Sequence, residues 1–165
     1  GEQAALAFLG QILDKSQRKK GAARNTGGDA AIHAAAAFTN AFSIQVDLSS
    51  WMPDGRLEFG PYQGAPGGAG YSLAYRPGQP LELLSVSGRG ARVIDRGSGP
   101  LTLEDKSPHS IEWTRRADGR MAVSVDGAEV LNTADRGFGG AFDGFRLVNR
   151  GGDFIVRSVS IKGTE

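Results

Sequence analysis

Cysteine is absent from the 165-residue chain, and histidine is scarce. The first absence excludes disulfide bonds, thiolate metal ligands and a cysteine nucleophile. The two histidines are His33 and His109, and neither has a carboxylate at the helical or strand spacing of a shared zinc site. His109 follows Pro108 at the start of an expected strand, where a polar residue at the sheet edge is ordinary. We therefore expect neither histidine to be a catalytic group or a metal ligand.

Long apolar runs and a large net charge are also missing. No run of about 18 apolar residues occurs, and residues 4–13 are too short to span a bilayer. That segment also lacks the preceding basic region of a signal peptide. The net charge of +1 is far from the positive excess of nucleic-acid-binding domains. We expect no transmembrane segment and no nucleic acid as the main partner.

Motifs of covalent and phosphate chemistry are absent as well. There is no Gly-x-Ser-x-Gly elbow, and the glycines of residues 64–70 lack the lysine and the following helix of a phosphate loop.

The chain begins with Gly1 instead of methionine, from which we expect an excised or processed piece.

Glycine, in contrast, is abundant, with 25 residues. This is roughly twice ordinary usage. Glycine is favoured where the backbone needs a positive φ, so such a composition is typical of many short strands joined by tight turns. A length of 165 residues fits one domain with an appendage.

The first 28 residues differ from the rest. Apolar residues at three- and four-residue spacings predict a helix over residues 3–19, and the small, polar and glycine-rich residues 21–29 predict a linker. We divide the chain into a helical and basic lead-in, 1–28, and a domain, 29–165. Cations at a helix end are stabilised by its dipole, and a membrane contact is the alternative. The basic residues are Lys15, Arg18, Lys19, Lys20 and Arg24.

After residue 28 the apolar pattern has a period of two. Phe42, Ile44, Val46 and Leu48 alternate with polar residues, which predicts a strand with one buried face. Further strands are expected at 55–61, 69–76, 80–86, 90–95, 99–103, 142–149 and 153–161.

Two successive hairpins are expected between residues 109 and 131. Trp113 lies in the first alternating run, and Asp118-Gly119 and Asp126-Gly127 provide the turns. Aspartate before glycine favours the left-handed conformations of short hairpin turns.

These hairpins carry a family resemblance. The runs His109-Ser110-Ile111-Glu112-Trp113 and Val123-Ser124-Val125-Asp126-Gly127 resemble strands of laminin G-like and concanavalin A-like domains, and the closing runs 140–147 and 154–161 resemble those of bacterial 3-keto-disaccharide hydrolase-like members. Over residues 30–163 the resemblance implies an all-β, two-sheet antiparallel jelly-roll sandwich, here with a short N-terminal helix. It also implies a periplasmic, extracellular or cell-envelope bacterial protein. The superfamily includes lectins, hydrolases, adhesion modules and structural domains, so the resemblance does not choose the function or the oligomeric state.

Catalysis on this fold requires a carboxylate pair. The Glu-x-Asp-x-x-Glu motif of jelly-roll glycosidases is absent, and the candidates Glu58, Glu82 and Glu112 stand singly on different expected strands. We expect no catalysis. The alternative is a carbohydrate hydrolase or lyase that uses these glutamates.

Calcium is a metal that the resemblance implies. Its candidate ligands are Asp126, Asp135, Asp143 and Asp153. Loop carboxylates suit calcium, but no Asp-x-Asp-x-Asp cluster occurs, and Asp126 is explained by its turn. We expect no cofactor and leave calcium open.

Aromatic residues mark the best candidate ligand surface. Trp51, Tyr62, Tyr71 and Tyr75 lie in or beside a glycine-rich stretch, and sugar rings stack on such flat faces. Tyr71 and Tyr75 alternate with polar or small residues, which equally fits core packing. Our hypothesis is a non-catalytic recognition or structural module for a glycan or a protein partner.

Overall fold

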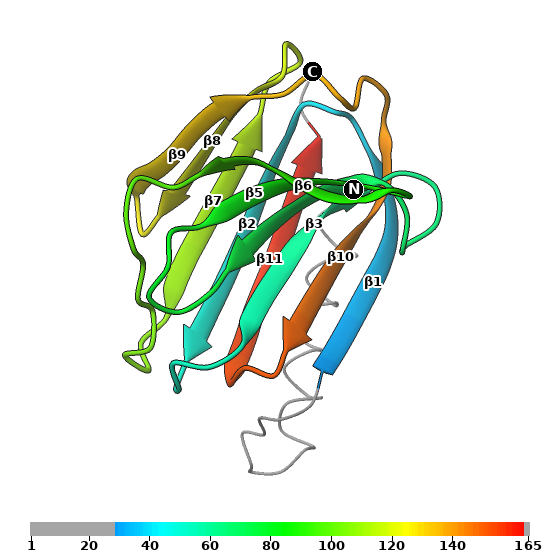
Figure 1. Ribbon diagram of the computed structural model, residues 1–165. Coiled ribbons are helices and arrows are strands. Elements are labelled where there is room, and N and C mark those ends of the chain that lie inside the picture. The colour runs from blue at the N-terminus through cyan, green and yellow to red at the C-terminus, as the bar shows by residue number, and fades with distance from the viewer. Residues whose placement is uncertain (1–28, 164–165) are drawn as a thin grey trace.

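The computed structural model describes residues 29–163, so the expected helix, the linker and the basic lead-in lie outside the described residues. Within residues 29–163 the chain forms eleven strands and two sheets (Figure 1). The strands are β1 (Asp29–Phe38), β2 (Phe42–Ser50), β3 (Arg56–Tyr62), β4 (Gly70–Tyr75), β5 (Glu82–Ser87), β6 (Gly90–Arg96), β7 (His109–Arg115), β8 (Arg120–Val125), β9 (Ala128–Ala134), β10 (Phe142–Arg150) and β11 (Phe154–Gly163).

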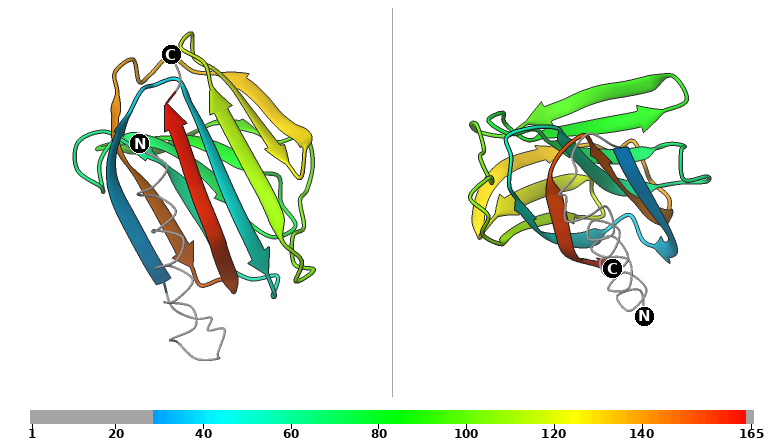
Figure 2. Two further views of the ribbon diagram at one scale, coloured as in Figure 1. Left: turned by 180° about the vertical axis from the view of Figure 1, so that it is seen from behind. Right: turned by 90° about the horizontal axis from the view of Figure 1, so that it is seen from below.

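The two sheets lie face to face as the layers of an antiparallel sandwich (Figure 2). One sheet has six strands in the order β1-β10-β3-β4-β5-β6, and the other has five in the order β11-β2-β7-β8-β9. The strands β3 to β6 and β7 to β9 follow one another as meanders. The C-terminal strands are inserted elsewhere, since β10 lies between β1 and β3 and β11 pairs with β2. The all-β sandwich expected from the sequence is confirmed.

The core lies between the sheets and is built by alternation. Phe42, Ile44, Val46 and Leu48 of β2 are each at most 1% exposed, as the period of two predicted. Trp113 is fully buried, and its ring centroid lies 5.4 Å from that of Phe42. The opposite residues of each strand consequently point outward, and they form the two exposed faces of the sandwich.

The aspartate-glycine turns form where they were expected. Asp126 and Gly127 have φ values of 52° and 86°, the left-handed pair that a tight two-residue hairpin needs. At the β7–β8 turn the backbone N–H of Arg116 donates to the carbonyl of Arg120. These local signals fix the register of the β7–β8–β9 meander.

Two segments differ from the sequence analysis. Residues 29–38 were assigned no strand, yet they form β1 in register with β10. Four successive alanines, 34–37, have weak β propensity, and the pairing of Ala34 and Ala35 with β10 holds this segment extended up to a register shift before Phe38. Residues 99–103 were expected to be a strand, and that was wrong, because only Leu101 makes an isolated bridge, to Gln79. Pro100 lacks the N–H that a continuous ladder would use.

Candidate functional site

The exposed face of the six-stranded sheet holds the most developed group of polar side chains. Cross-strand pairing aligns Val148, Glu58, Ala74, Glu82 and Arg96 in one row from β10 to β6. Directly paired residues of an antiparallel sheet point to the same side. Leu57, Leu73 and Leu83 alternate with this row and are buried in the core, so the row itself faces outward.

Two depressions lie on this face. The first is lined by Arg56, Ala74, Arg76, Gln79, Pro80, Glu82 and Arg96. The second is lined by Arg56, Glu58, Ser72, Leu84, Val86, Ala91, Arg146, Val148 and Arg150. Arg56 belongs to both, so the depressions are neighbours on one surface.

Ion pairs with glutamates hold three of the arginines of this face. Glu58 Oε2 lies 2.6 Å from Arg56 Nε, and Glu58 Oε1 accepts a hydrogen bond of 3.2 Å from Arg150 Nε. Glu82 accepts a hydrogen bond of 3.0 Å from Arg96 Nε. Each glutamate therefore already serves as the acceptor of a guanidinium group, and the face combines fixed donors with fixed acceptors.

The floor between these charged groups is low because its residues are small. Gly60 is flanked by Arg146 on β10, and Ser72 and Ala74 lie on β4. A Cβ atom at Gly60 would lie 2.0 Å from the carbonyl oxygen of Tyr71, so only glycine fits this close approach of β3 and β4. These arginines and small residues were not among the site residues predicted from the sequence, although Arg56 and Glu58 alternate with the buried Leu57.

The aromatic candidates lie elsewhere. Tyr71 and Tyr75 are fully buried in the core, the alternative that their alternation favoured, so their rings do not form an exposed platform. Burial raises the pKa of each tyrosine above its ordinary value, and a hydrogen bond from its hydroxyl to a carboxylate adds to this effect. The hydroxyl of Tyr71 donates to Asp135 at 2.5 Å, and that of Tyr75 donates to Glu104.

The other two aromatic candidates are Tyr62 and Trp51. Tyr62 is 3% exposed, pairs with Gly144, and lies against its Cα. Trp51 is partly exposed in the β2–β3 loop, where its neighbour Met52 is 45% exposed. Neither aromatic residue lines the two depressions. A role of Trp51 in ligand binding stays a prediction.

The three glutamate candidates are divided between the sheets. Glu58 and Glu82 flank Ala74 on the same face, so their Cα atoms are two strand spacings apart, about 10 Å. Glu112 is exposed on β7, on the outer face of the five-stranded sheet. The structure thus brings two of the candidates to one face and leaves the third across the core.

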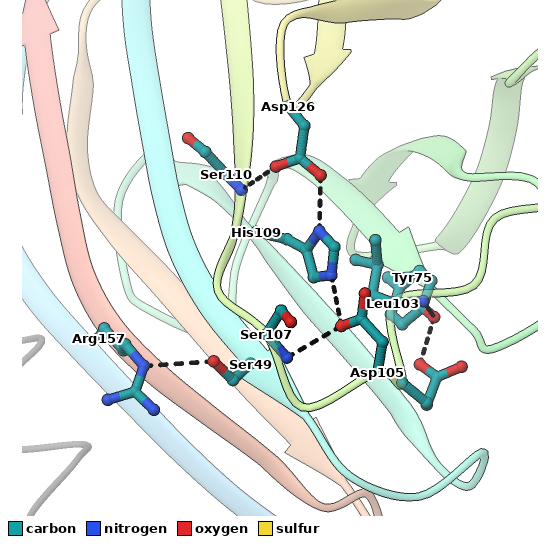
Figure 3. Close-up of polar contacts among 10 residues, drawn as sticks. Ser49, Tyr75, Leu103, Asp105, Ser107, His109, Ser110, Asp126 and Arg157 are labelled. Atoms are coloured by element: carbon teal, nitrogen blue, oxygen red, sulfur yellow. Dashed lines mark hydrogen bonds and ion pairs between the residues drawn. The ribbon is translucent and has the colours of Figure 1, made fainter.

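His109 lies in a second polar cluster, at the start of β7 in the middle of the five-stranded sheet (Figure 3). Its Nδ1 is 2.6 Å from Asp126 Oδ2, and its Nε2 is 2.7 Å from Asp105 Oδ1. Burial lowers the pKa of His109, but the two carboxylates outweigh this effect, so its pKa lies above the ordinary value. The backbone N–H of Ser110 also donates to Asp126. The imidazole joins the segment before β7 to the β8–β9 turn.

The remaining calcium candidates are Asp135, Asp143 and Asp153, and Asp143 lies on β10. Asp135 accepts a hydrogen bond from the backbone N–H of Gly137, and Asp143 accepts one from the backbone N–H of Gly64. Asp153 is buried. In the part of the chain that the structure describes, no three histidine, aspartate or glutamate residues gather in a group that could hold a metal ion. His33 is exposed on β1 opposite Arg146.

No helix among residues 29–163 has the length and apolar character to cross a bilayer.

Comparisons with known proteins bear on the fold. No protein-family model matches the chain, and no curated protein matches its sequence. Among solved structures, the carbohydrate-binding module CBM66 from Bacillus subtilis has a TM-score of 0.69 at 15% identity, over 84% of each chain. Congerin II with lactose and MES has a TM-score of 0.62 at 14% identity, over 82% of this chain and all of its own. The galectin LEC-6 from Caenorhabditis elegans has a TM-score of 0.60 at 18% identity, over 84% of this chain and 94% of its own.

These identities are low, so the likeness shows the fold alone. The chain has a two-sheet antiparallel sandwich, a fold that it shares with a carbohydrate-binding module and with galectins.

Proposed function

We propose that this chain is a non-catalytic carbohydrate-binding module, and that a glycan binds on the exposed face of the six-stranded sheet. One observation carries the proposal. On that face, two neighbouring depressions combine small floor residues with fixed guanidinium and carboxylate groups. A binding site of this kind orients a ligand through a few placed polar groups and an apolar floor.

The chemistry of the face suits a sugar. Hydroxyl groups both donate and accept hydrogen bonds, and the face provides donors on Arg56 and Arg150 and acceptors on Glu58 and Glu82. Leu84 and Val86 add apolar surface for the C–H groups of a sugar ring. Two structures with the same fold support the class of ligand, since one is a carbohydrate-binding module and the other is liganded with lactose.

We propose a non-catalytic module because Glu58 and Glu82 both form ion pairs with arginines. Glu58 pairs with two arginines and Glu82 with one. The hydrolase alternative would use Glu58 and Glu82 as its carboxylate pair, and it predicts that bound oligosaccharide is cleaved during the binding assay. A location at the cell envelope, a protein partner and a 3-keto-disaccharide hydrolase-like grouping stay predictions from the sequence.

A glycan array followed by calorimetric titration tests the proposal. The variant Ala74→Trp fills the first depression with a bulky ring, and we expect it to abolish the binding of any glycan that the parent chain binds. Its matched control is Ala122→Trp, at a position facing outward on β8 of the other sheet. Thermal unfolding of both variants shows whether each still folds.

The proposal fails if the parent chain binds no glycan on the array. It also fails if Ala74→Trp, while folded, binds as tightly as the parent chain, because the glycan would then lie on another surface.

A further inference from the structure

The exposed face of the six-stranded sheet carries more positive charge than the chain as a whole. Five arginines and two glutamates line its two depressions, which leaves a formal excess of three positive charges. The whole chain has a net charge of only +1. The charge that looked unremarkable when averaged over the sequence is therefore concentrated on one surface. A surface of this kind attracts anionic ligands.

Arg146 is an available anchor for an anion on this surface. Its Nη1 donates to the carbonyl of Pro66 at 3.2 Å, and no carboxylate of residues 30–163 pairs with it. Its cross-strand neighbour on β3 is Gly60, which has no side chain. The guanidinium group of Arg146 consequently borders the open floor of the second depression.

On the same face, two arginines already bind the carboxylate of Glu58. Arg56 and Arg150 pair directly across β3 and β10, an arrangement in which like charges repel. Glu58 lies between them, 2.6 Å from Arg56 and 3.2 Å from Arg150. Guanidinium groups match carboxylates in geometry as well as in charge. Arg146 lies four residues before Arg150 on the same strand and faces the same side.

The floor of the depression favours a saccharide over a nucleic acid. Among the residues that line the second depression, Ser72 and Ala91 are small, and Leu84 and Val86 make part of the lining apolar. None of the residues that line the two depressions is aromatic. Single-stranded nucleic acids need aromatic rings on which their bases stack, so the face lacks the platform for that partner.

We propose that this face binds an acidic saccharide, with a uronate carboxylate held by Arg146 and Arg150 beside the low floor of β3 and β4. The inference rests on the proposed carbohydrate-binding function and names the class of its ligand.

Isothermal titration calorimetry of the full chain with a hexamer of galacturonic acid tests this inference. The same hexamer, fully methyl-esterified, is the neutral match. We expect the free acid to bind about tenfold more tightly than the ester, the effect of one charge-assisted hydrogen bond. Added salt should reduce this difference, because the site is open to solvent.

Variants locate the carboxylate. Arg146→Gln should remove most of the preference for the acid, and Arg146→Lys should keep part of it, because lysine retains the charge and loses the bidentate geometry. Arg116→Gln is the control, since Arg116 is exposed in the β7–β8 turn, outside this face.

The outcomes separate this inference from the proposed function. Equal binding of acid and ester, both lost in Ala74→Trp, would overturn the acidic ligand and leave the carbohydrate-binding function standing. If neither hexamer binds, the acidic ligand is overturned, and neutral glycans on the array decide the function. A DNA oligonucleotide or a sulfated oligosaccharide that binds as tightly as the acidic hexamer would overturn the assignment to a carboxylated sugar.

Discussion

The buried guanidinium group of Arg115 should be a main support of one end of the sandwich. Arg115 is 3% exposed, and its Nη atoms donate to the carbonyl of Asn40 at 2.9 Å and to that of Asp135 at 2.6 Å. Nη2 also donates to the Tyr71 hydroxyl at 3.3 Å, and the guanidinium carbon lies 5.3 Å from the centroid of the Tyr71 ring. The group thus joins β7 to two loops that are distant in sequence.

The variant Arg115→Met keeps much of the length of the side chain and removes these donors. A hydrogen bond from a charged donor is worth about 1.5–3 kcal/mol, and the relief from burying a charge offsets part of the loss. We expect the free energy of unfolding to fall by about 3 kcal/mol. For a chain of this size the melting temperature should drop by about 6–12 °C.

Urea and thermal unfolding measure this change, and the neighbouring Arg116→Met is the control. Arg116 is exposed, so its replacement should change the free energy of unfolding by less than about 0.5 kcal/mol. If Arg115→Met lowers it by no more than this control, the network around Arg115 does not support the fold and the reasoning is refuted.

Three further predictions concern other parts of the molecule. Gly144→Ala should lower the free energy of unfolding by about 1–3 kcal/mol, because the added Cβ would lie 2.3 Å from the Tyr62 ring and 2.5 Å from the carbonyl oxygen of Ala34. The control is Gly139→Ala, which has open space around it and should leave the free energy of unfolding unchanged in urea. The His109 pKa is raised above the ordinary 6.5, so its contribution to stability should be complete below about pH 6.5 and disappear as the pH rises through the folded pKa. The stability difference between the parent chain and His109→Gln should therefore shrink as the pH rises above about 6.5, and a constant difference would contradict the ion pairs with Asp105 and Asp126. Trp51→Ala should leave glycan affinity unchanged if the sheet face is the site, and a large loss of affinity by titration would move the site to the β2–β3 loop.

Local signals predicted much of the fold. The alternation of β2 and the aspartate-glycine turns around β8 act between residues close in sequence, so they can be read without the structure. The weak strand β1 could not be predicted in this way, because its alanines are extended only through their pairing with β10, more than a hundred residues later.

The candidate site was harder to predict, since it depends on which strands are neighbours. Alternation alone correctly allowed Tyr71 and Tyr75 to be core residues. It could not show that Arg146 and Arg150 of β10 meet Arg56 and Glu58 of β3, because that pairing joins distant segments.

The sequence by itself determined the class of the fold, because glycine-rich turns and a period of two permit only short strands with one buried face. Only the tertiary structure decided where the charge lies. Because β10 is inserted between β1 and β3, arginines from separate strands lie together on one exposed face. The net charge is a sum over the whole chain, so it cannot show where in the structure the charged residues lie.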